Sequence, residues 1–341
     1  MEIISESHIL DWNPDHPLRT VAKGYRIRDR NVEDGYTLVF AHGIGSNKEQ
    51  WEPTMKALYR LSIKSAKSPQ IREMWAIDCP NHGQAAILND ELLMRGGYNN
   101  HAFSWEEYIK IFRLFLTRNP KFNLNNHRLI GIGHSMGAVC LSLTQTYPEN
   151  PNFEALILCE PMMAPTDLPR DHPAFKGPEA MSVYTLKRRD IWSSREAAQD
   201  LRSKSAYAKW DNEAFNAYLD YGLRDLPTAF YPDKTEGVTL ACAKVQEAAT
   251  YRDSITSRRA YEFLPALYSR LPVHIIWGEQ SDLLALEVKE RVSDTQYGRK
   301  PASVQRVKNA GHLVPQTEPS GLAEAIYLAL SGRTTGTSGR L

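Results

Sequence analysis

The sequence has little of what marks secreted, membrane-spanning or nucleic-acid-binding proteins. Only 4 of its 341 residues are cysteines, and none has the spacing of a metal site or a paired redox motif, so we expect a reducing compartment. The 41 lysines and arginines against 40 aspartates and glutamates leave a net charge of +1, which disfavours a nucleic-acid partner. No apolar run reaches membrane-spanning length, and residues 1–6 lack the basic start of a signal peptide. We therefore expect an intracellular protein with no membrane span.

Apolar stretches of strand length alternate with stretches of helical periodicity along most of the chain. The pattern predicts strands at 36–41, 74–78, 155–159, 272–278 and 303–307, and in the apolar run that starts at Leu129. Strands alternating with helices at these intervals imply right-handed crossovers and a mainly parallel sheet. With 42% hydrophobic residues, the chain can form one large α/β domain with an insertion, or two modest domains.

The alternation breaks between residues 162 and 270, where the spacing is helical and aromatic and polar residues are frequent. An interval this long between two strands of one sheet predicts a helical lid over the strand ends. We therefore divide the chain into a core over 1–161 and 271–332, a lid over 162–270 and a flexible tail over 333–341. The lid aromatics are expected to line a substrate pocket, although none can be singled out: Trp192, Tyr207, Trp210, Phe215, Tyr218, Tyr221, Phe230, Tyr231 and Tyr251.

A serine bracketed by glycines follows the run that starts at Leu129. Residues 133–137 read Gly-His-Ser-Met-Gly, and a buried helical pattern follows them. Gly-x-Ser-x-Gly between a strand and a helix is typical of a nucleophile elbow, in which glycines without Cβ atoms let the two elements approach closely. Ser135 is therefore the predicted nucleophile. The N-terminus of the following helix is expected beneath it, where free N–H groups can receive negative charge.

The strand at 36–41 ends in His42-Gly43-Ile44-Gly45. A strand that stops at His-Gly-x-Gly before a helix can leave its next backbone N–H groups directed into a cleft. We assign the N–H of Ile44 to an oxyanion hole, with the N–H of Met136 as the second donor.

His312 follows the last predicted strand in a Gly-His loop and is the predicted base for Ser135. The imidazolium that forms needs a carboxylate partner, and two acids stand at the ends of predicted strands, Glu160 and Asp282. The residues leave open which of the two completes the triad. The chain order serine, acid, histidine is the one expected of α/β-hydrolases.

Two further stretches carry a resemblance. Residues 40–53 read Phe-Ala-His-Gly-Ile-Gly-Ser-Asn-Lys-Glu-Gln-Trp-Glu-Pro, and residues 158–161 read Leu-Cys-Glu-Pro. Together with the elbow they resemble a fungal α/β-hydrolase family that includes peroxisomal lipase-like proteins, hydrolases of host-selective toxin pathways and the acyl-CoA hydrolase of mycophenolic acid biosynthesis. The Lys-Glu-x-Trp-Glu-Pro stretch at 48–53 is far more specific than the elbow.

The resemblance covers most of the sheet and implies the α/β-hydrolase fold, a mainly parallel sheet flanked by helices with a helical lid insertion. It also implies Ser135 and His312 as catalytic residues and maps the acid to Glu160. Asp282 keeps that last assignment open.

We therefore expect a serine hydrolase that cleaves an ester or thioester through an acyl-enzyme, in fungal secondary or lipid metabolism. The expected substrate is a small acyl-CoA or polyketide-derived acyl molecule, and no metal or organic cofactor is expected. One alternative is an acyltransferase or cyclase, if the lid excludes water and admits an alcohol or amine. The other is a non-catalytic binding protein on a hydrolase scaffold, because a fold does not fix a function.

The chain ends Gly339-Arg340-Leu341, which resembles the Ser-Lys-Leu peroxisomal signal with glycine in place of serine. Members of the resembled family often end in such a signal. The tail therefore raises the hypothesis of a peroxisomal import receptor as partner, with a cytoplasmic location as the other expectation.

Overall fold

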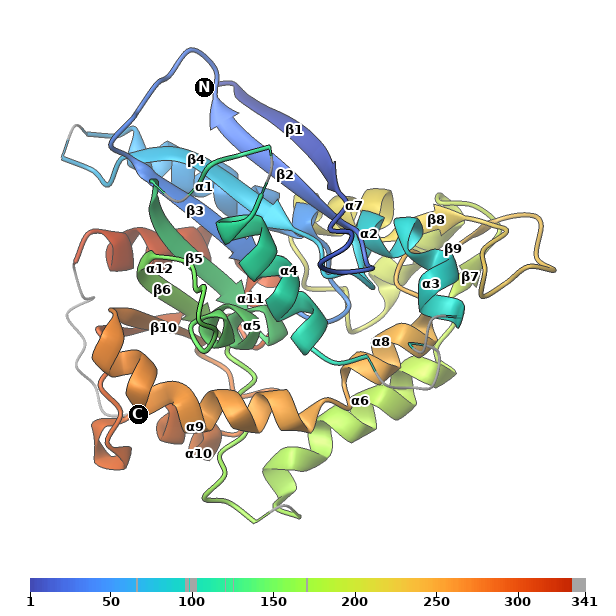
Figure 1. The fold of residues 1–341 in the computed structure, drawn as a ribbon. Coiled ribbons are helices and arrows are strands. Elements are labelled where there is room, and N and C mark those ends of the chain that lie inside the picture. Colours follow the sequence, from blue (N-terminus) through green and yellow to red (C-terminus); the bar gives the residue numbers. More distant parts are fainter. Residues whose placement is uncertain are drawn as a thin grey trace.

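The computed structural model describes residues 1–332 except 66, 96, 97, 99–102, 120, 125 and 170. Its main sheet has eight strands in the order β1-β2-β4-β3-β5-β6-β10-β11 (Figure 1). The predicted tail over 333–341 lies outside the described residues. The strands are β1 (Ile3–Leu10), β2 (Thr20–Ile27), β3 (Tyr36–Ala41), β4 (Ile71–Ile77), β5 (Arg128–His134), β6 (Phe153–Cys159), β10 (Val273–Gly278) and β11 (Ser303–Val307).

The sheet is antiparallel only at one edge, where β1 pairs with β2 and β2 with β4. From β4 to β11 every neighbouring pair is parallel. The carboxyl ends of β3, β5, β6 and β10 therefore meet at one edge of the sheet, where ligands bind in open α/β folds. The mainly parallel sheet that the sequence predicts is confirmed.

Helices cover both faces of this sheet, and each face has its own apolar core. One face packs against α1 (Glu52–Ser62) and α12 (Pro319–Leu330). The other packs against α4 (Glu106–Thr117), α5 (Met136–Thr144), α9 (Ser254–Arg270) and α10 (Leu286–Ser293). Every residue of α5 is buried, because this helix crosses the centre of the sheet directly after Ser135.

The interval 162–270 contains more than helices. It holds α6 (Lys176–Lys187), α7 (Asn212–Tyr221), α8 (Lys244–Thr250) and a small antiparallel sheet of β7 (Ile191–Trp192), β9 (Val238–Leu240) and β8 (Leu223–Asp225). These strands could not be predicted from the sequence, because two or three residues are too few for a period of two to appear. A separate aromatic core around Trp192, Trp210 and Tyr218 holds this part together.

The last helix of the interval, α9, belongs to the main core. Ala260, Leu264 and Leu267 are buried in the same cluster as α5 and the sheet, whereas Phe215, Tyr218 and Leu219 of α7 belong to the separate aromatic core. The division at residues 162 and 270 stays a prediction.

Shorter elements complete the described chain: α2 (Gly83–Leu88), α3 (Asp90–Arg95), α11 (Val314–Thr317) and the 3-10 helices Lys48–Trp51, Pro173–Phe175, Ala197–Ser203 and Thr295–Tyr297. No helix in the described ranges is both long and apolar enough to cross a membrane.

Candidate active site

Ser135 lies at a sharp turn between β5 and α5, with φ of 56° and ψ of −119°. A non-glycine residue with positive φ is strained and is held there only when its surroundings fix it. Two close approaches do so. A Cβ on Gly133 would lie 2.5 Å from the backbone N of Ala138, and a Cβ on Gly137 would lie 2.4 Å from the carbonyl O of Ala41. The glycines of the motif are therefore required by space.

The imidazole of His312 lies between Ser135 and Glu160. Its Nε2 is 3.0 Å from Ser135 Oγ, and its Nδ1 is 3.2 Å from Glu160 Oε2. All three side chains are buried, with Ser135 and His312 each 5% exposed and Glu160 0%. Residues 177 positions apart in the chain are thus neighbours above the carboxyl edge of the sheet. An Nδ1–H donated to the carboxylate leaves Nε2 to accept the hydroxyl proton of Ser135.

Asp282, the other acid that the sequence left open, contacts His312 at a different point. Its Oδ1 accepts the backbone N–H of His312 at 2.8 Å and the N–H of Leu283 at 2.9 Å. A Cβ on Gly311 would lie 2.0 Å from Asp282 Oδ2, so glycine is required before the histidine. Asp282 therefore fixes the loop, and Glu160 contacts the ring.

The carbonyl group of His312 is held as well. His134 Nε2 lies 2.8 Å from this carbonyl O and donates to it. Burial, together with the charge of His312, lowers the pKa of His134 to about 3. His134 is therefore neutral at ordinary pH, and the backbone of His312 is fixed at its N–H by Asp282 and at its C=O by His134.

The second oxygen of Glu160 has two donors of its own. Oε1 accepts the N–H of Gly278 at 2.6 Å and the ammonium of Lys289 at 2.8 Å. Lys289 lies on α10, is 1% exposed, and also donates to the carbonyl groups of Gly278 at 3.2 Å and Gln280 at 3.1 Å. Burial would raise the pKa of Glu160, but the hydrogen bond and charge of His312, followed by those of Lys289, bring it below its ordinary value.

Ile44 and Met136, the two predicted oxyanion donors, flank Ser135. Met136 is the first residue of α5, where a backbone N–H has no partner within the helix. Ile44 follows β3 and lines the same cavity as Ser135.

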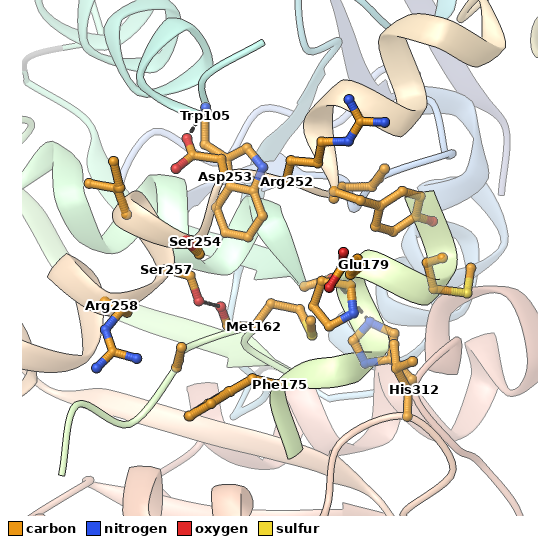
Figure 2. A pocket seen from close by; sticks show the side chains of 18 of the residues that line it. Trp105, Met162, Phe175, Glu179, Arg252, Asp253, Ser254, Ser257, Arg258 and His312 are labelled. Carbon is orange, nitrogen blue, oxygen red and sulfur yellow. Dashed lines mark hydrogen bonds between the residues drawn. The ribbon is translucent and has the colours of Figure 1, made fainter. Parts of the chain in front are cut away.

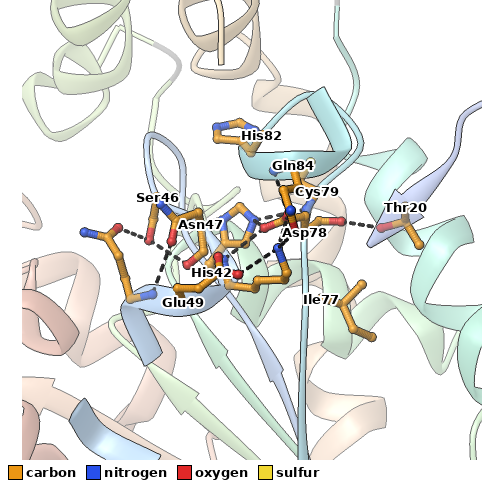
Figure 3. Close-up of polar contacts among 12 residues, drawn as sticks. Thr20, His42, Ser46, Asn47, Glu49, Ile77, Asp78, Cys79, His82 and Gln84 are labelled. Atoms are coloured by element: carbon orange, nitrogen blue, oxygen red, sulfur yellow. Dashed lines mark hydrogen bonds and ion pairs between the residues drawn. The ribbon is translucent and has the colours of Figure 1, made fainter. Parts of the chain in front are cut away.

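Two histidines hold the peptides on either side of Ile44. His42 Nε2 accepts the N–H of Cys79 at 3.0 Å, so its Nδ1 carries the proton and donates to the carbonyl O of Gly43 at 2.8 Å. His82 Nε2 accepts the N–H of Gly45 at 3.0 Å. Figure 3 shows His42 beside Asp78 and Cys79. Burial lowers the pKa of His42 and brings that of His82 well below 6.5, so both rings act as neutral groups.

A buried ion pair anchors the chain just beyond this loop. Lys48 Nζ lies 2.9 Å from Asp78 Oδ2, and the Lys48 N–H donates to Asp78 Oδ1 at 3.0 Å. Glu49 Oε1 is also 2.9 Å from Lys48 Nζ, and burial raises the pKa of Glu49 to about 7. Lys48 therefore ties the loop after β3 to Asp78, the residue that directly follows β4.

A cavity of about 680 Å³ opens over Ser135 and His312. Met162 and Phe175 line it from the interval that follows β6, as Figure 2 shows. A volume of this size suits a small organic molecule. The arrangement can therefore present a carbonyl carbon to Ser135 Oγ while covering much of the molecule that carries it.

Sequence reasoning missed Lys289, His82 and His134. Lys289 lies on a helix without a motif, and its partner Glu160 is 129 positions away. His82 precedes Gly83, and His134 ends β5 between Gly133 and Ser135, positions where a histidine is unremarkable. The one available signal was their position at the carboxyl ends of predicted strands, which they share with His42 and His312.

Comparison with known proteins finds one matching family and relatives from fungi. The profile of the alpha/beta hydrolase family matches residues 38–325. The type I acyl-CoA thioesterase mpaH′ of Penicillium brevicompactum is 28% identical over 274 residues, 77% of this chain and 58% of that protein. The type I acyl-CoA thioesterase mpaH of Penicillium roqueforti is 30% identical over 234 residues, 68% of this chain and 47% of that protein. The chain thus spans about half the length of these relatives.

Among solved structures, the peroxisomal alpha-beta-hydrolase Lpx1 of Saccharomyces cerevisiae superimposes with a TM-score of 0.69. The match covers 96% of this chain and 87% of Lpx1 at 18% sequence identity, which supports a shared fold.

Proposed function

Because the chain belongs to the alpha/beta hydrolase family, we propose that it is a serine hydrolase that cleaves an ester or thioester through an acyl-enzyme on Ser135. One observation carries the proposal. The hydroxyl of Ser135, the ring of His312 and the carboxylate of Glu160 form one hydrogen-bonded chain inside a cavity. This is the order of groups that activates a serine for acyl transfer.

In the first half of the reaction, Ser135 Oγ attacks the carbonyl carbon while His312 Nε2 takes the hydroxyl proton. The charge that develops on the carbonyl oxygen is received by the N–H groups of Ile44 and Met136. Each such donor contributes on the order of 3 kcal/mol to stabilisation of the transition state. His312 then gives its proton to the departing alcohol or thiol, and the acyl group stays on Ser135.

In the second half, water loses a proton to His312 and attacks the acyl-enzyme. His312 then gives that proton to Ser135 Oγ as the acid leaves, which restores the serine hydroxyl. Glu160 keeps Nδ1 of His312 protonated and stabilises the imidazolium in both halves. Lys289 and the N–H of Gly278 occupy the other carboxylate oxygen, which supports an ionised Glu160 with its Oε2 facing the ring.

For the substrate, we propose an acyl-CoA or a polyketide-derived acyl ester or thioester. The thioesterase names of the Penicillium relatives support this class, as does the cavity of about 680 Å³ over Ser135. We also propose a peroxisomal location, supported by the Lpx1 match and by the Gly-Arg-Leu ending. Blocking the C-terminus with a fluorescent protein should change a punctate distribution into a diffuse one, and an unchanged distribution would contradict import through the tail.

The test of the activity compares wild type with Ser135→Ala on acyl-CoA thioesters and simple esters, with and without an added alcohol or amine. The proposal predicts free acid and free thiol from wild type only. An ester or amide formed with the added nucleophile in place of free acid would identify an acyltransferase. Solving Ser135→Ala with a bound thioester would then report which acyl group the cavity takes.

A further inference from the structure

A second cavity adjoins the one over Ser135. It has a volume of about 450 Å³, and Ile44, Met181, Tyr251 and Leu313 line both. We call this cavity the second chamber. Gly45 and Ser46, which directly follow the proposed oxyanion donor Ile44, line the second chamber alone. A molecule whose carbonyl lies at Ser135 can therefore extend past Ile44 into it.

Six aromatic residues line the second chamber. Tyr184 is one of them and is 58% exposed, so its ring is accessible from solvent. Flat rings offer contact area at a low cost in conformational entropy and suit recognition of an organic molecule. The other aromatic residues that line the chamber are Trp192, Tyr207, Trp210, Tyr218 and Tyr251.

The charges of the two cavities differ in sign. Three acidic and two basic residues line the cavity over Ser135, whereas four basic and two acidic residues line the second chamber. Within the second chamber, Arg188 pairs with Glu247, and Arg189 pairs with Asp200 at 3.0 Å. Both acids are thus already neutralised by arginines.

Two lysines of the second chamber are not paired with either of its acidic residues. Lys187 ends α6 and Lys204 follows the 3-10 helix Ala197–Ser203, and both side chains are exposed. Among the residues that the structure describes, neither ammonium group has an ion-pair or hydrogen-bond partner. The chamber therefore carries two uncompensated positive charges next to an apolar aromatic wall.

We propose that the second chamber binds the anionic end of the substrate whose carbonyl reacts at Ser135, with Lys187 and Lys204 contacting a carboxylate or a phosphate. This rests on the proposed function. Opposite charge brings an anionic end to this chamber and away from the acidic residues around the first. The anion belongs either to the leaving group, as the phosphates of an acyl-CoA, or to the acyl group, as a free carboxylate.

The test uses four substrates with short acyl groups. Butyryl-CoA carries its anion on the leaving group, and the mono-4-nitrophenyl ester of glutaric acid carries it on the acyl group. Butyryl-N-acetylcysteamine and 4-nitrophenyl butyrate are the neutral partners of these two. The variant is Lys187→Glu with Lys204→Glu. The matched control is Lys64→Glu with Lys234→Glu, which makes the same charge change at exposed positions that line neither cavity.

We expect kcat/KM of an anionic substrate to fall about tenfold or more in the Lys187/Lys204 variant, mainly through KM, while the neutral substrates and the control variant stay within about twofold. The loss should shrink in 0.5 M salt, because exposed charges are screened. A loss confined to butyryl-CoA places the leaving group in the chamber, and a loss confined to the glutarate ester places the acyl group there. Equal changes on charged and neutral substrates would overturn the proposal.

Ligand binding to the second chamber can also be measured in a variant that lacks the Ser135 hydroxyl. Calorimetry on Ser135→Ala compares butyryl-CoA with its neutral partner, and the lysine substitutions in that background should weaken only the charged ligand. Labelling of Ser135 by a fluorophosphonate reports the proposed function separately. If Ser135 of wild type is labelled but the lysine substitutions cause no loss specific to charged substrates, the anion site in the second chamber is wrong and the proposed function stands. If Ser135 is not labelled but the lysine substitutions still weaken only the charged ligand, the hydrolase mechanism is wrong and the anion site stands.

Discussion

Two networks meet at Ser135, and they hold the two halves of the site by different means. On one side, the ring of His312 lies in a chain of ionisable groups that continues to Glu160 and Lys289. On the other side, the loop around Ile44 is fixed by His42 and His82, which burial keeps neutral. The first network depends on charge and therefore on pH. The second depends on which ring nitrogen of His42 and His82 carries the proton, and near neutral pH these two rings stay neutral.

The largest effect is expected where the two networks meet. Ser135→Ala removes the proposed nucleophile, and kcat should fall roughly a millionfold, as when the serine of a hydrolase triad is removed. His312→Ala should cost about as much, because the two residues act as a unit. Steady-state kcat on the best thioester measures both, with circular dichroism as the check on folding. Activity within tenfold of wild type would rule out Ser135 as the nucleophile.

The next prediction separates the two acids at His312. Glu160→Gln should lower kcat about 10⁴-fold because it loses the carboxylate that orients and stabilises the imidazolium. Asp282→Asn keeps the ring contact and disturbs only the loop, so about a tenfold loss is expected. The measurement is kcat for the two variants side by side.

Glu160→Gln also leaves the Lys289 ammonium buried without its carboxylate, which costs about 3–5 kcal/mol of stability. Glu160→Gln combined with Lys289→Met removes that charge, so it should regain stability without regaining kcat. A larger kcat loss in Asp282→Asn than in Glu160→Gln would reverse the assignment of the acid.

Lys289→Met tests the charged network through its pH dependence. Lys289 helps to bring the pKa of Glu160 below its ordinary value of 4.5, and burial opposes it. Without Lys289 the pKa of Glu160 rises. The stability that an ionised Glu160 contributes is present above pH 4.5 in wild type and is lost as pH falls through the lowered pKa. In the variant this loss should begin at higher pH, as urea unfolding at several pH values would show. The same dependence of stability on pH in the two proteins would contradict the role of Lys289.

His82→Leu tests the neutral network and should have the smallest effect. Its loss leaves the Gly45 N–H without an acceptor and loosens the peptide next to Ile44. We expect kcat to fall on the order of tenfold, less than the loss of an entire oxyanion donor. Because burial brings the pKa of His82 well below 6.5, the ratio of variant to wild-type kcat should be equal at pH 6 and pH 8. A ratio that changes with pH would show that His82 titrates.

The parts of the molecule that could be predicted from the sequence are those that local sequence patterns determine. The period of apolar residues located the parallel strands, and the glycines at 133 and 137 marked the turn because only they fit its close approaches. His312 could be proposed for Ser135 because the carboxyl ends of parallel strands share an edge.

Other features depend on the directions of side chains, which cannot be predicted from the spacing of residues along the chain. Glu160 and Asp282 stand at equivalent strand ends, and only side-chain geometry decides that one contacts the ring and the other the backbone N–H. The contacts of Lys289 with Glu160 and of Gly45 with His82 join segments far apart in the chain. The strands β7, β8 and β9 are too short to show a period.

Site-mapped labelling shows whether Ser135 is a nucleophile that Glu160 activates through His312. Wild-type protein and Glu160→Gln are treated with a fluorophosphonate, and the rate of modification at Ser135 is followed by peptide mass spectrometry. We expect modification of Ser135 alone among the serines of wild type, and a rate that is lower by about a hundredfold or more in Glu160→Gln. Folded wild-type protein left unmodified at Ser135, or equal rates in the two proteins, would contradict this expectation.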